Sequence, residues 1–283
     1  MQPVEIGDAS TRRVRVGSGL PLAWIAGPCV IEDRRVMGGT AERLKKLAEK
    51  LDVPLVFKSS YEKDNRSTEL SYQGPGLDDG LEMLAWIKKE FELPVLSDVH
   101  RVEDIAAARE VLDVIQIPAF LCQQTSLVIA VGKSGKVVNV KKAQFMSPEG
   151  MYSAVGKIER TGNRRILLTD RGAQFGYNNV IADMTAIPVM KEHGYPVVFD
   201  AGHQVRRYGI PSTDPNGSAN KEHIPALLRA SVAAGANAVF LETHPRPAEA
   251  LCDAASQFPL DQMEDLMSQT RDLAQLMREQ GHA

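Results

Sequence analysis

Thiol, imidazole and carboxylate side chains follow short apolar runs at several widely separated points of the sequence. Four of them are Cys29, His203, Glu242 and Asp253. These donor types suit a borderline divalent ion such as Zn²⁺, Fe²⁺ or Mn²⁺. His100 and His244 are competing imidazole ligands, and spacing alone does not choose among the histidines. The alternative is that Cys29 is a small buried apolar residue and Glu242 a salt-bridge partner.

Cationic side chains follow the same kind of run. They are Lys58, Lys63, Arg66, Lys141 and Arg171. Arginine binds phosphate or carboxylate through bidentate hydrogen bonds, whereas lysine supplies a point charge. Five cations exceed what one phosphate needs, so the pattern predicts substrates that together carry several negative charges. For Lys63 and Arg66 alone, a solvated charged turn is the alternative. Because strand side chains alternate, only one of Lys141 and Lys142 can point inward.

The elements that must position these residues alternate along the chain. Eight short aliphatic runs are predicted as strands, at 22–26, 54–58, 94–98, 114–118, 137–141, 166–170, 196–200 and 238–242. Amphipathic stretches between them predict helices, for example at 40–51, 80–91, 102–112, 180–193 and 224–234. This rhythm predicts an α/β fold, a (β/α)₈ TIM barrel. An open doubly wound sheet is the alternative, but the first strand lacks a following Gly-rich turn.

Barrel closure would bring the metal-donor types together. It places the eighth strand beside the first and the seventh next to the eighth, so the strand ends that carry Glu242, Cys29 and His203 become neighbours. Asp253 follows Glu242 after one turn and could supply a fourth ligand. Active sites of such barrels lie at the carboxyl ends of the strands, and we therefore expect an enzyme with its site there.

We expect residues 1–283 to form one domain, because no linker or shift in composition divides the chain. Residues 1–17 do not follow the alternating rhythm. Their two short apolar stretches flank a Gly-Asp-Ala-Ser turn, which predicts a β-hairpin closing the bottom, amino-terminal face of the barrel. Residues 260–280 are predicted to form a helix packed on the outside.

The composition argues against several kinds of partner. Lys and Arg number 33 against 36 Asp and Glu, so the chain has no overall basic field with which to hold nucleic acid. The longest apolar stretch, 20–31, is too short to span a membrane. Three separated cysteines and the lack of a secretory signal at the N-terminus lead us to expect a cytoplasmic protein without disulfides.

Six ordered motifs resemble one known family. They are Ala26-Gly-Pro-Cys29, the segment from Lys58 to Ser67 (KSSYEKDNRS), Gln116-Ile-Pro-Ala-Phe120, Asn139-Val-Lys-Lys142, Asp170-Arg-Gly172 and Glu242-Thr-His-Pro245. Together they resemble the 3-deoxy-D-manno-octulosonate 8-phosphate synthases (KDO 8-phosphate synthases), over nearly the whole chain. The Asn65-Arg-Ser67 element distinguishes the chain from the related 3-deoxy-arabino-heptulosonate 7-phosphate synthases.

The resemblance implies an activity and a role for each matching residue. The family condenses phosphoenolpyruvate with arabinose 5-phosphate and water, releasing phosphate and an eight-carbon sugar acid phosphate for lipopolysaccharide. The resemblance implies that Lys141 and Arg171 hold the phosphate of phosphoenolpyruvate, that Ser60 and Gln116 line its site and that Lys58 lies in the pocket. Lys63 would lie near its carboxylate and the sugar aldehyde, and the implied sugar ligands are Asn65, Arg66 and Ser67. The implied catalytic residues are Lys63, His203 and Asp253. The family is usually a homotetramer, so we expect one here.

The residue after Gly27-Pro28 separates two branches of that family. Cys29 stands where the metal-independent branch has Asn, and the segment 252–257 also resembles the metal-dependent form. The resemblance therefore implies a divalent metal ion, Zn, Fe or Mn, held by Cys29, His203, Glu242 and Asp253. The metal would activate the water or position the aldehyde oxygen.

Several departures from the family pattern fall on the sugar side. Gln123 stands where Arg is usual, Ser126 where Asp is usual, Asp64 where Ala is usual, and Gly202 where Thr or Ser is usual. The loop 206–221 also differs. A homologous synthase that uses another aldose phosphate is therefore an alternative. An aldolase with Lys141 as a Schiff-base nucleophile is another. A catalytically silent barrel that binds phosphorylated sugars is a third.

Overall fold

The structure is a computed structural model, and it describes the chain except for residues 67, 178, 208–213, 215–218 and 283. Its strands are β1 Val4–Ile6, β2 Val14–Val16, β3 Ala23–Gly27, β4 Leu55–Lys58, β5 Val95–Asp98, β6 Val114–Ile117, β7 Val137–Lys141, β8 Ile166–Asp170, β9 Ala173–Gly176, β10 Asn179–Ile181, β11 Val197–Asp200, β12 Ala238–His244 and β13 Phe258–Pro259. Its α-helices are α1 Arg34–Leu51, α2 Leu77–Phe91, α3 Ile105–Val111, α4 Thr125–Lys133, α5 Tyr152–Glu159, α6 Ala186–Lys191, α7 Ala201–Gln204, α8 Ile224–Ala233 and α9 Met263–Glu279.

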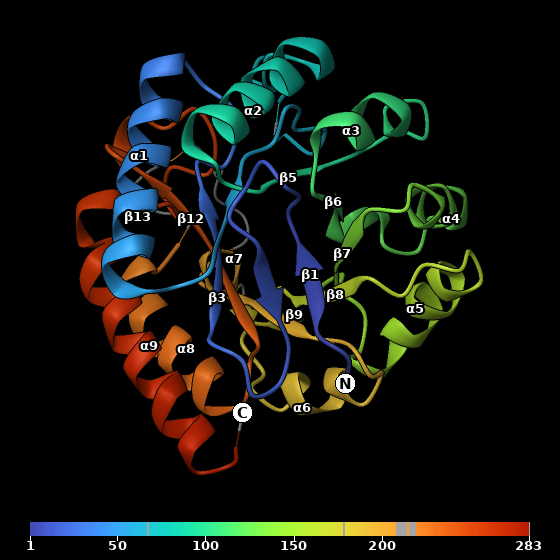
Figure 1. Cartoon of the computed structure of the whole chain (residues 1–283), viewed down its shortest axis with the longest axis vertical. Helices are drawn as coiled ribbons and strands as arrows, with labels where there is room; N and C mark the ends of the chain where they lie inside the picture. Colours follow the sequence, from blue (N-terminus) through green and yellow to red (C-terminus); the bar gives the residue numbers. More distant parts are fainter. Residues whose placement is uncertain (67, 178, 208–213, 215–218, 283) are drawn as a thin grey trace.

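Eight parallel strands close into a barrel. The hydrogen-bonded order is β11-β8-β7-β6-β5-β4-β3-β12, and β11 also pairs with β12, which closes the ring. The helices surround the strands (Figure 1). Each of the predicted runs forms one of these strands, and the predicted (β/α)₈ barrel is confirmed. The closing pair, in which Val198 lies opposite Ala238, excludes the open doubly wound sheet.

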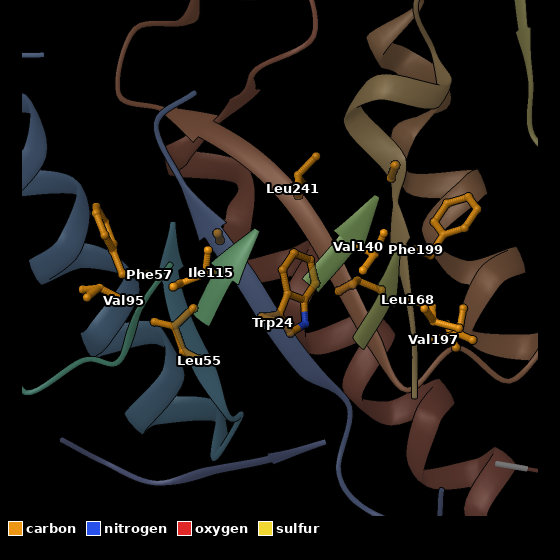
Figure 2. Packing of buried hydrophobic residues seen from close by; sticks show 14 of the residues in the cluster. Trp24, Leu55, Phe57, Val95, Ile115, Val140, Leu168, Val197, Phe199 and Leu241 are labelled. Atoms are coloured by element: carbon orange, nitrogen blue, oxygen red, sulfur yellow. The ribbon is translucent and has the colours of Figure 1, made fainter. Parts of the chain in front are cut away.

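Strand alternation divides the buried side chains into two layers. One layer faces the helices and includes Trp24, Phe57 and Phe199; Figure 2 shows part of it. The alternate residues, such as Ile25 and Val56, face the barrel axis and form a separate cluster inside the ring. Both layers are apolar through the lower part of the strands, as expected for parallel strands that are buried on both faces.

The N-terminal segment forms an antiparallel ribbon. Strand β1 pairs with β2, with Val4 opposite Val16 and Ile6 opposite Val14. These four side chains are buried in the same cluster as the axial residues of the barrel strands. The ribbon therefore closes the amino-terminal end of the barrel with apolar side chains, while Glu5 between them faces solvent.

The prediction of one helix over residues 180–193 is wrong at its amino-terminal end. Residues 179–181 form strand β10, which pairs with β9, and helix α6 covers only Ala186–Lys191. The pairing involves the β-branched residue Ile181, which lies opposite Ala173. Apolar residues at helical spacing do not reveal this pairing, because the short partner strand β9 has no sequence pattern that predicts a strand.

Helix α9 lies on the outside of the barrel beside α1 and α8 (Figure 1). It begins at Met263, after a short 3₁₀ turn over Leu260–Gln262. Arg43 of α1 donates a hydrogen bond of 3.2 Å to Glu264 of α9. The apolar face of α9, which includes Met263, Leu266 and Met267, is buried in the outer layer.

Ile6→Ala should lower the free energy of unfolding by about 2–5 kcal/mol, because it opens a cavity under the barrel. Glu5→Ala on the same strand is the control and should change it by less than about 0.5 kcal/mol, because Glu5 is exposed. Urea unfolding followed by circular dichroism measures both. Equal effects of the two variants would show that the ribbon does not seal the barrel.

Candidate active site

The axial side chains change from apolar to charged toward the carboxyl ends of the strands. Two residues after the axial Val56, Leu96, Val114, Val198 and Phe240 come five buried polar side chains, which are Lys58, Asp98, Gln116, Asp200 and Glu242. The same alternation leads from Val137 through Asn139 to Lys141 on β7. The top of the barrel interior is therefore a layer of buried charges, which is where barrel enzymes carry their sites.

The alternation also settles which lysine of β7 points inward. Lys141 Nζ lies 2.7 Å from Asp200 Oδ2 inside the ring. Lys142 points to the opposite face, where its Nζ lies 3.3 Å from Asp170 Oδ1 and donates to the Gly172 carbonyl at 2.9 Å. Lys141 is thus the lysine of the site, and Lys142 belongs to the wall between strands.

Two adjoining cavities lie above this layer. The first, of about 110 Å³, includes Lys63, Gln116, Lys141 and Arg171 in its lining. The second, of about 140 Å³, is lined by a set that includes Lys63, Arg171 and His203, all shared with the first, and also Arg66, Arg206 and Asp253. Four of the five predicted cations, all except Lys58, therefore converge on one space, and Asn65 lines both cavities as well.

Some predicted site residues lie beside the cavities and not in their lining. Cys29, Lys58, Ser60 and Glu242 are almost fully buried beneath them. Ser67 lies outside the described residues. Without a rearrangement of the site, these four side chains can affect a substrate in the cavities only through the residues that line them.

Lys58 and Glu242 form a buried ion pair. Their Nζ and Oε1 atoms are 2.9 Å apart, and Lys58 also donates to the Cys29 carbonyl at 2.9 Å. Burial alone would raise the pKa of Glu242, but the neighbouring cationic groups, Lys58 foremost, outweigh it and the pKa falls to about 2. This close approach of β3 to β4 needs Gly27, because a Cβ there would lie 2.1 Å from the Lys58 carbonyl oxygen.

Asp98 joins several groups at the end of β5. It accepts a hydrogen bond from the Ser60 hydroxyl, and its Oδ2 lies 3.9 Å from Lys63 Nζ and 3.5 Å from His100 Nε2. Burial alone would lower the pKa of Lys63, but Asp98 and the neighbouring acidic groups raise it above its usual range. Lys63 is therefore a cation at neutral pH on the wall shared by both cavities.

The predicted metal donors meet around Asp253. The ligand atoms of His203, Glu242 and Asp253 lie within 4.8 Å of one another, and so do those of Cys29, Cys252 and Asp253. Cys252, which directly precedes Asp253, is a further donor that its position in the sequence does not single out. The predicted ligands thus come from the ends of β3 and β12, from α7 and from the loop after β12.

The orientation of these groups fits a divalent ion. Asp200 Oδ2 lies 2.8 Å from His203 Nδ1, which leaves Nε2 facing Asp253 at 3.5 Å. Burial alone would raise the pKa of Asp253, but the Arg206 guanidinium, 3.0 Å from Asp253, contributes most to holding it well below its usual range. Burial raises the pKa of the Cys29 thiol, so binding a metal there would release a proton.

The competing histidines are engaged elsewhere. His244 Nε2 lies 3.3 Å from Glu32, and its Nδ1 accepts a hydrogen bond from the backbone N–H of Arg246. His100 pairs with Asp98 and lines the first cavity. Among the described residues, neither is part of a group that could hold a metal.

The loop after β4 contacts the loop that carries the metal donors. Arg66 donates to Cys252 Sγ at 2.7 Å and to the Leu251 carbonyl at 3.3 Å. The solvated-turn alternative for Lys63 and Arg66 therefore does not describe them, because both line the second cavity.

The fold and the site together define a barrel enzyme with an anion-binding space next to a cluster of metal donors. The chain belongs to the DAHP synthetase I family, whose model matches residues 3–279. It is 47% identical over 271 residues to a 2-dehydro-3-deoxyphosphooctonate aldolase of Trichlorobacter lovleyi, covering 96% of this chain and 99% of the relative. A protein of the same name from Protochlamydia amoebophila is 47% identical over 266 residues, covering 94% of this chain and 96% of the relative.

A further relative with that name, from Geobacter metallireducens, is 46% identical over 265 residues, covering 94% of this chain and 97% of the relative. The similarity therefore spans the strands and loops that carry the site. In the described part of the chain, no helix has the length and apolar character needed to cross a membrane.

Lys58→Met should lower the free energy of unfolding at pH 7 by about 3–5 kcal/mol, because it leaves Glu242 buried without its partner. The depressed pKa means that the stabilisation is present above the unfolded value of 4.5 and is lost as pH falls through about 2. Urea unfolding in EDTA at pH 7 and pH 3 should therefore show a smaller difference at pH 3.

Lys50→Met is the control for that measurement. Lys50 pairs with Glu264 on the surface, so its loss should change the free energy of unfolding by less than about 1 kcal/mol. A Lys58→Met effect no larger than this control would contradict the account of Lys58 and Glu242 as a buried ion pair.

Proposed function

We propose that this chain condenses phosphoenolpyruvate with arabinose 5-phosphate and water, giving 3-deoxy-D-manno-octulosonate 8-phosphate and phosphate. This is the reaction of the KDO 8-phosphate synthases, which supply a sugar of lipopolysaccharide. The observation that carries the proposal is the pair of adjoining cavities, lined by cations and bordered by metal donors. The name shared by the relatives supports the same reaction.

Phosphoenolpyruvate would occupy the first cavity. Lys141 and Arg171 would hold its phosphate, since both cations line that cavity. Lys63 and Gln116 would face its carboxylate end, with Ser60 below them held by Asp98. Lys58 would contribute through its positive charge and by holding Glu242, because it is buried beneath the cavity.

The sugar phosphate would occupy the second cavity. Asn65 and Arg66 line it and would bind the sugar and its phosphate, together with Ser67. The aldehyde carbon must lie at the junction of the cavities, where C3 of phosphoenolpyruvate forms the new carbon–carbon bond. Lys63 and His203 line both cavities, so they border this junction. We assign Lys63, His203 and Asp253 as the catalytic residues on this basis.

A divalent ion, Zn, Fe or Mn, would be held by Cys29, His203, Glu242 and Asp253. When bound, it would act as a Lewis acid on an oxygen of the aldehyde or water. The protein groups orient the donors: Lys58 holds Glu242, and Asp200 holds His203. Two anionic handles in neighbouring cavities would align the reacting carbons, which converts binding energy into rate.

A synthase for another aldose phosphate is the second candidate. Asp64 lines the first cavity and adds a negative charge close to the sugar-binding loop. Gln123 is exposed, and its backbone carbonyl accepts a hydrogen bond from Lys157. These two residues differ from the family pattern on the acceptor side. Turnover of a series of aldose 5-phosphates, in which arabinose 5-phosphate is not the best acceptor, would favour this candidate.

We further propose a homotetramer located in the cytoplasm. Phe145 is 52% exposed, Phe175 91% and Tyr177 100%, and the Gln174 N–H donates to the Gln144 carbonyl beside Phe145. Exposed aromatic residues grouped in this way favour an interface between subunits. Light scattering coupled to gel filtration measures the number of subunits.

The cytoplasmic location rests on a separate observation. The described cysteines are all free, which suits a reducing compartment.

EDTA should lower the rate of phosphate release from phosphoenolpyruvate and arabinose 5-phosphate at least about 100-fold, because Lewis-acid stabilisation is worth several kcal/mol. Added Mn²⁺ or Zn²⁺ should restore it.

The variant Cys29→Ala should bind metal more weakly than the wild type. The control Cys122→Ala, which alters a buried thiol beside Met146, should bind metal as the wild type does. Full activity in EDTA would contradict the metal assignment, and borohydride trapping of substrate on Lys141 would favour the Schiff-base aldolase.

Arg66→Ala should raise KM for arabinose 5-phosphate by about 10- to 100-fold and leave KM for phosphoenolpyruvate nearly unchanged, since it removes one charge-assisted contact. Arg171→Ala should do the reverse. Steady-state kinetics with each substrate varied in turn measures both. If either variant raises both KM values equally, the division of substrates between the cavities is wrong.

A further inference from the structure

Asp200, at the end of β11, lies between the two halves of the site. Its Oδ2 atom is 2.7 Å from Lys141 Nζ and 2.8 Å from His203 Nδ1. The residue is fully buried. One carboxylate oxygen therefore contacts both the lysine that would hold a phosphate and the histidine that would hold a metal.

The contact with His203 sets the state of the imidazole. With Nδ1–H donating a hydrogen bond to the carboxylate, the lone pair is on Nε2, which faces Asp253. Ligand histidines commonly have such a carboxylate partner, which fixes the ring and makes it a better donor. Among the described acidic residues, Asp200 is the one within 3 Å of His203.

The contact with Lys141 keeps a buried cation in place. Lys141 Nζ lies 3.7 Å above the ring of Phe240, with little access to water. Burial lowers its pKa, the charges of Lys58 and Arg171 act in the same direction, and Asp200 opposes them. Without Asp200, Lys141 would be a poorly compensated charge in an apolar setting.

We infer that Asp200 is a positioning residue that couples the two half-sites, so that a divalent cation at His203 strengthens binding of the phosphate group at Lys141. The coupling follows from the shared oxygen. A cation on Nε2 polarises the Nδ1–H bond, draws Oδ2 toward His203 and leaves more of the Lys141 charge for a phosphate. By linkage, the phosphate ligand strengthens metal binding by the same factor. The inference rests on the proposed function.

A purely local role for Asp200 makes a different prediction. Its Oδ1 accepts a hydrogen bond of 3.1 Å from the backbone N–H of His203, which caps the short helix α7. Asn caps helices about as well as Asp. Asp200→Asn therefore keeps the shape and the cap but removes the charge on the oxygen shared by Lys141 and His203.

Asp170→Asn is the matched control. Asp170 ends the neighbouring strand β8, is also buried, and its Oδ1 lies 3.3 Å from the outward-facing Lys142. The substitution removes the same charge one strand away, without touching Lys141 or His203.

The first measurement is the Zn²⁺ dissociation constant of each purified protein, by competition with a chromophoric chelator. Asp200→Asn should weaken binding by about 10- to 100-fold, as loss of a carboxylate behind a ligand histidine does. Asp170→Asn should change it by less than about threefold. A wild-type Zn²⁺ affinity in Asp200→Asn would overturn the inference.

The second measurement is the affinity for phosphoenolpyruvate with and without Zn²⁺, by calorimetry in the absence of the sugar. Zn²⁺ should tighten binding at least about fivefold in the wild type, in the range typical of coupled sites. The ratio should fall toward one in Asp200→Asn. An unchanged ratio would overturn the coupling. A wild-type protein that binds neither Zn²⁺ nor phosphoenolpyruvate would instead contradict the proposed function itself.

The single variant Lys141→Met keeps Asp200 in place, so it leaves the inference testable if Asp200→Asn folds poorly, and a double-mutant cycle completes the test. Lys141→Met should tighten Zn²⁺ binding, because Asp200 then serves His203 alone. The effect should disappear when Asp200 is replaced by Ser in the same chain, which isolates the part carried by the carboxylate. An equal effect in both backgrounds would mean that Lys141 acts on the metal directly through space, and would overturn the role of Asp200.

Discussion

A closed barrel gives each strand side chain only two directions, toward the axis or toward the helices, and the rest of the molecule follows from this constraint. The axial positions are apolar in the lower part of the ring, as at Ile25 and Val56, and become charged near the carboxyl ends. Since the interior admits little water, every charge placed there needs a partner of opposite sign. The chemistry of the site is therefore built from pairs.

These pairs share members, which gives the site its geometry. Glu242 forms an ion pair with Lys58 and is also one of the metal donors. Asp98 accepts a hydrogen bond from Ser60 and lies close to Lys63 and His100. Buried ion pairs add little net stability compared with apolar residues, because desolvation offsets their attraction. Their value here is positional, since each carboxylate fixes two or more groups at once.

Much of this was accessible from the sequence because strand periodicity and barrel closure are strong constraints. The strand positions and the approach of the strand ends that carry Glu242 and His203 follow from them, and the turn residues indicate the ribbon. The selection of His203 over the other histidines, and of Asp253 as a ligand, came from the resemblance to the family. What the sequence did not yield depends on contacts between distant segments. Which of Lys141 and Lys142 points into the barrel depends on how strand β7 is oriented about its own axis. The β9–β10 hairpin could not be predicted because strand β9 is too short to be recognised from its sequence. Cys252 as a donor needs the path of a loop.

The apolar ribbon under the barrel determines at which end ligands can enter and leave. In the described part of the chain, β1 and β2 fill the amino-terminal end with side chains packed against the axial layer, and this packing closes that end of the ring. Substrates and products must therefore pass through the same opening, at the carboxyl ends of the strands. A product that stays bound therefore blocks the entrance that the next substrates need.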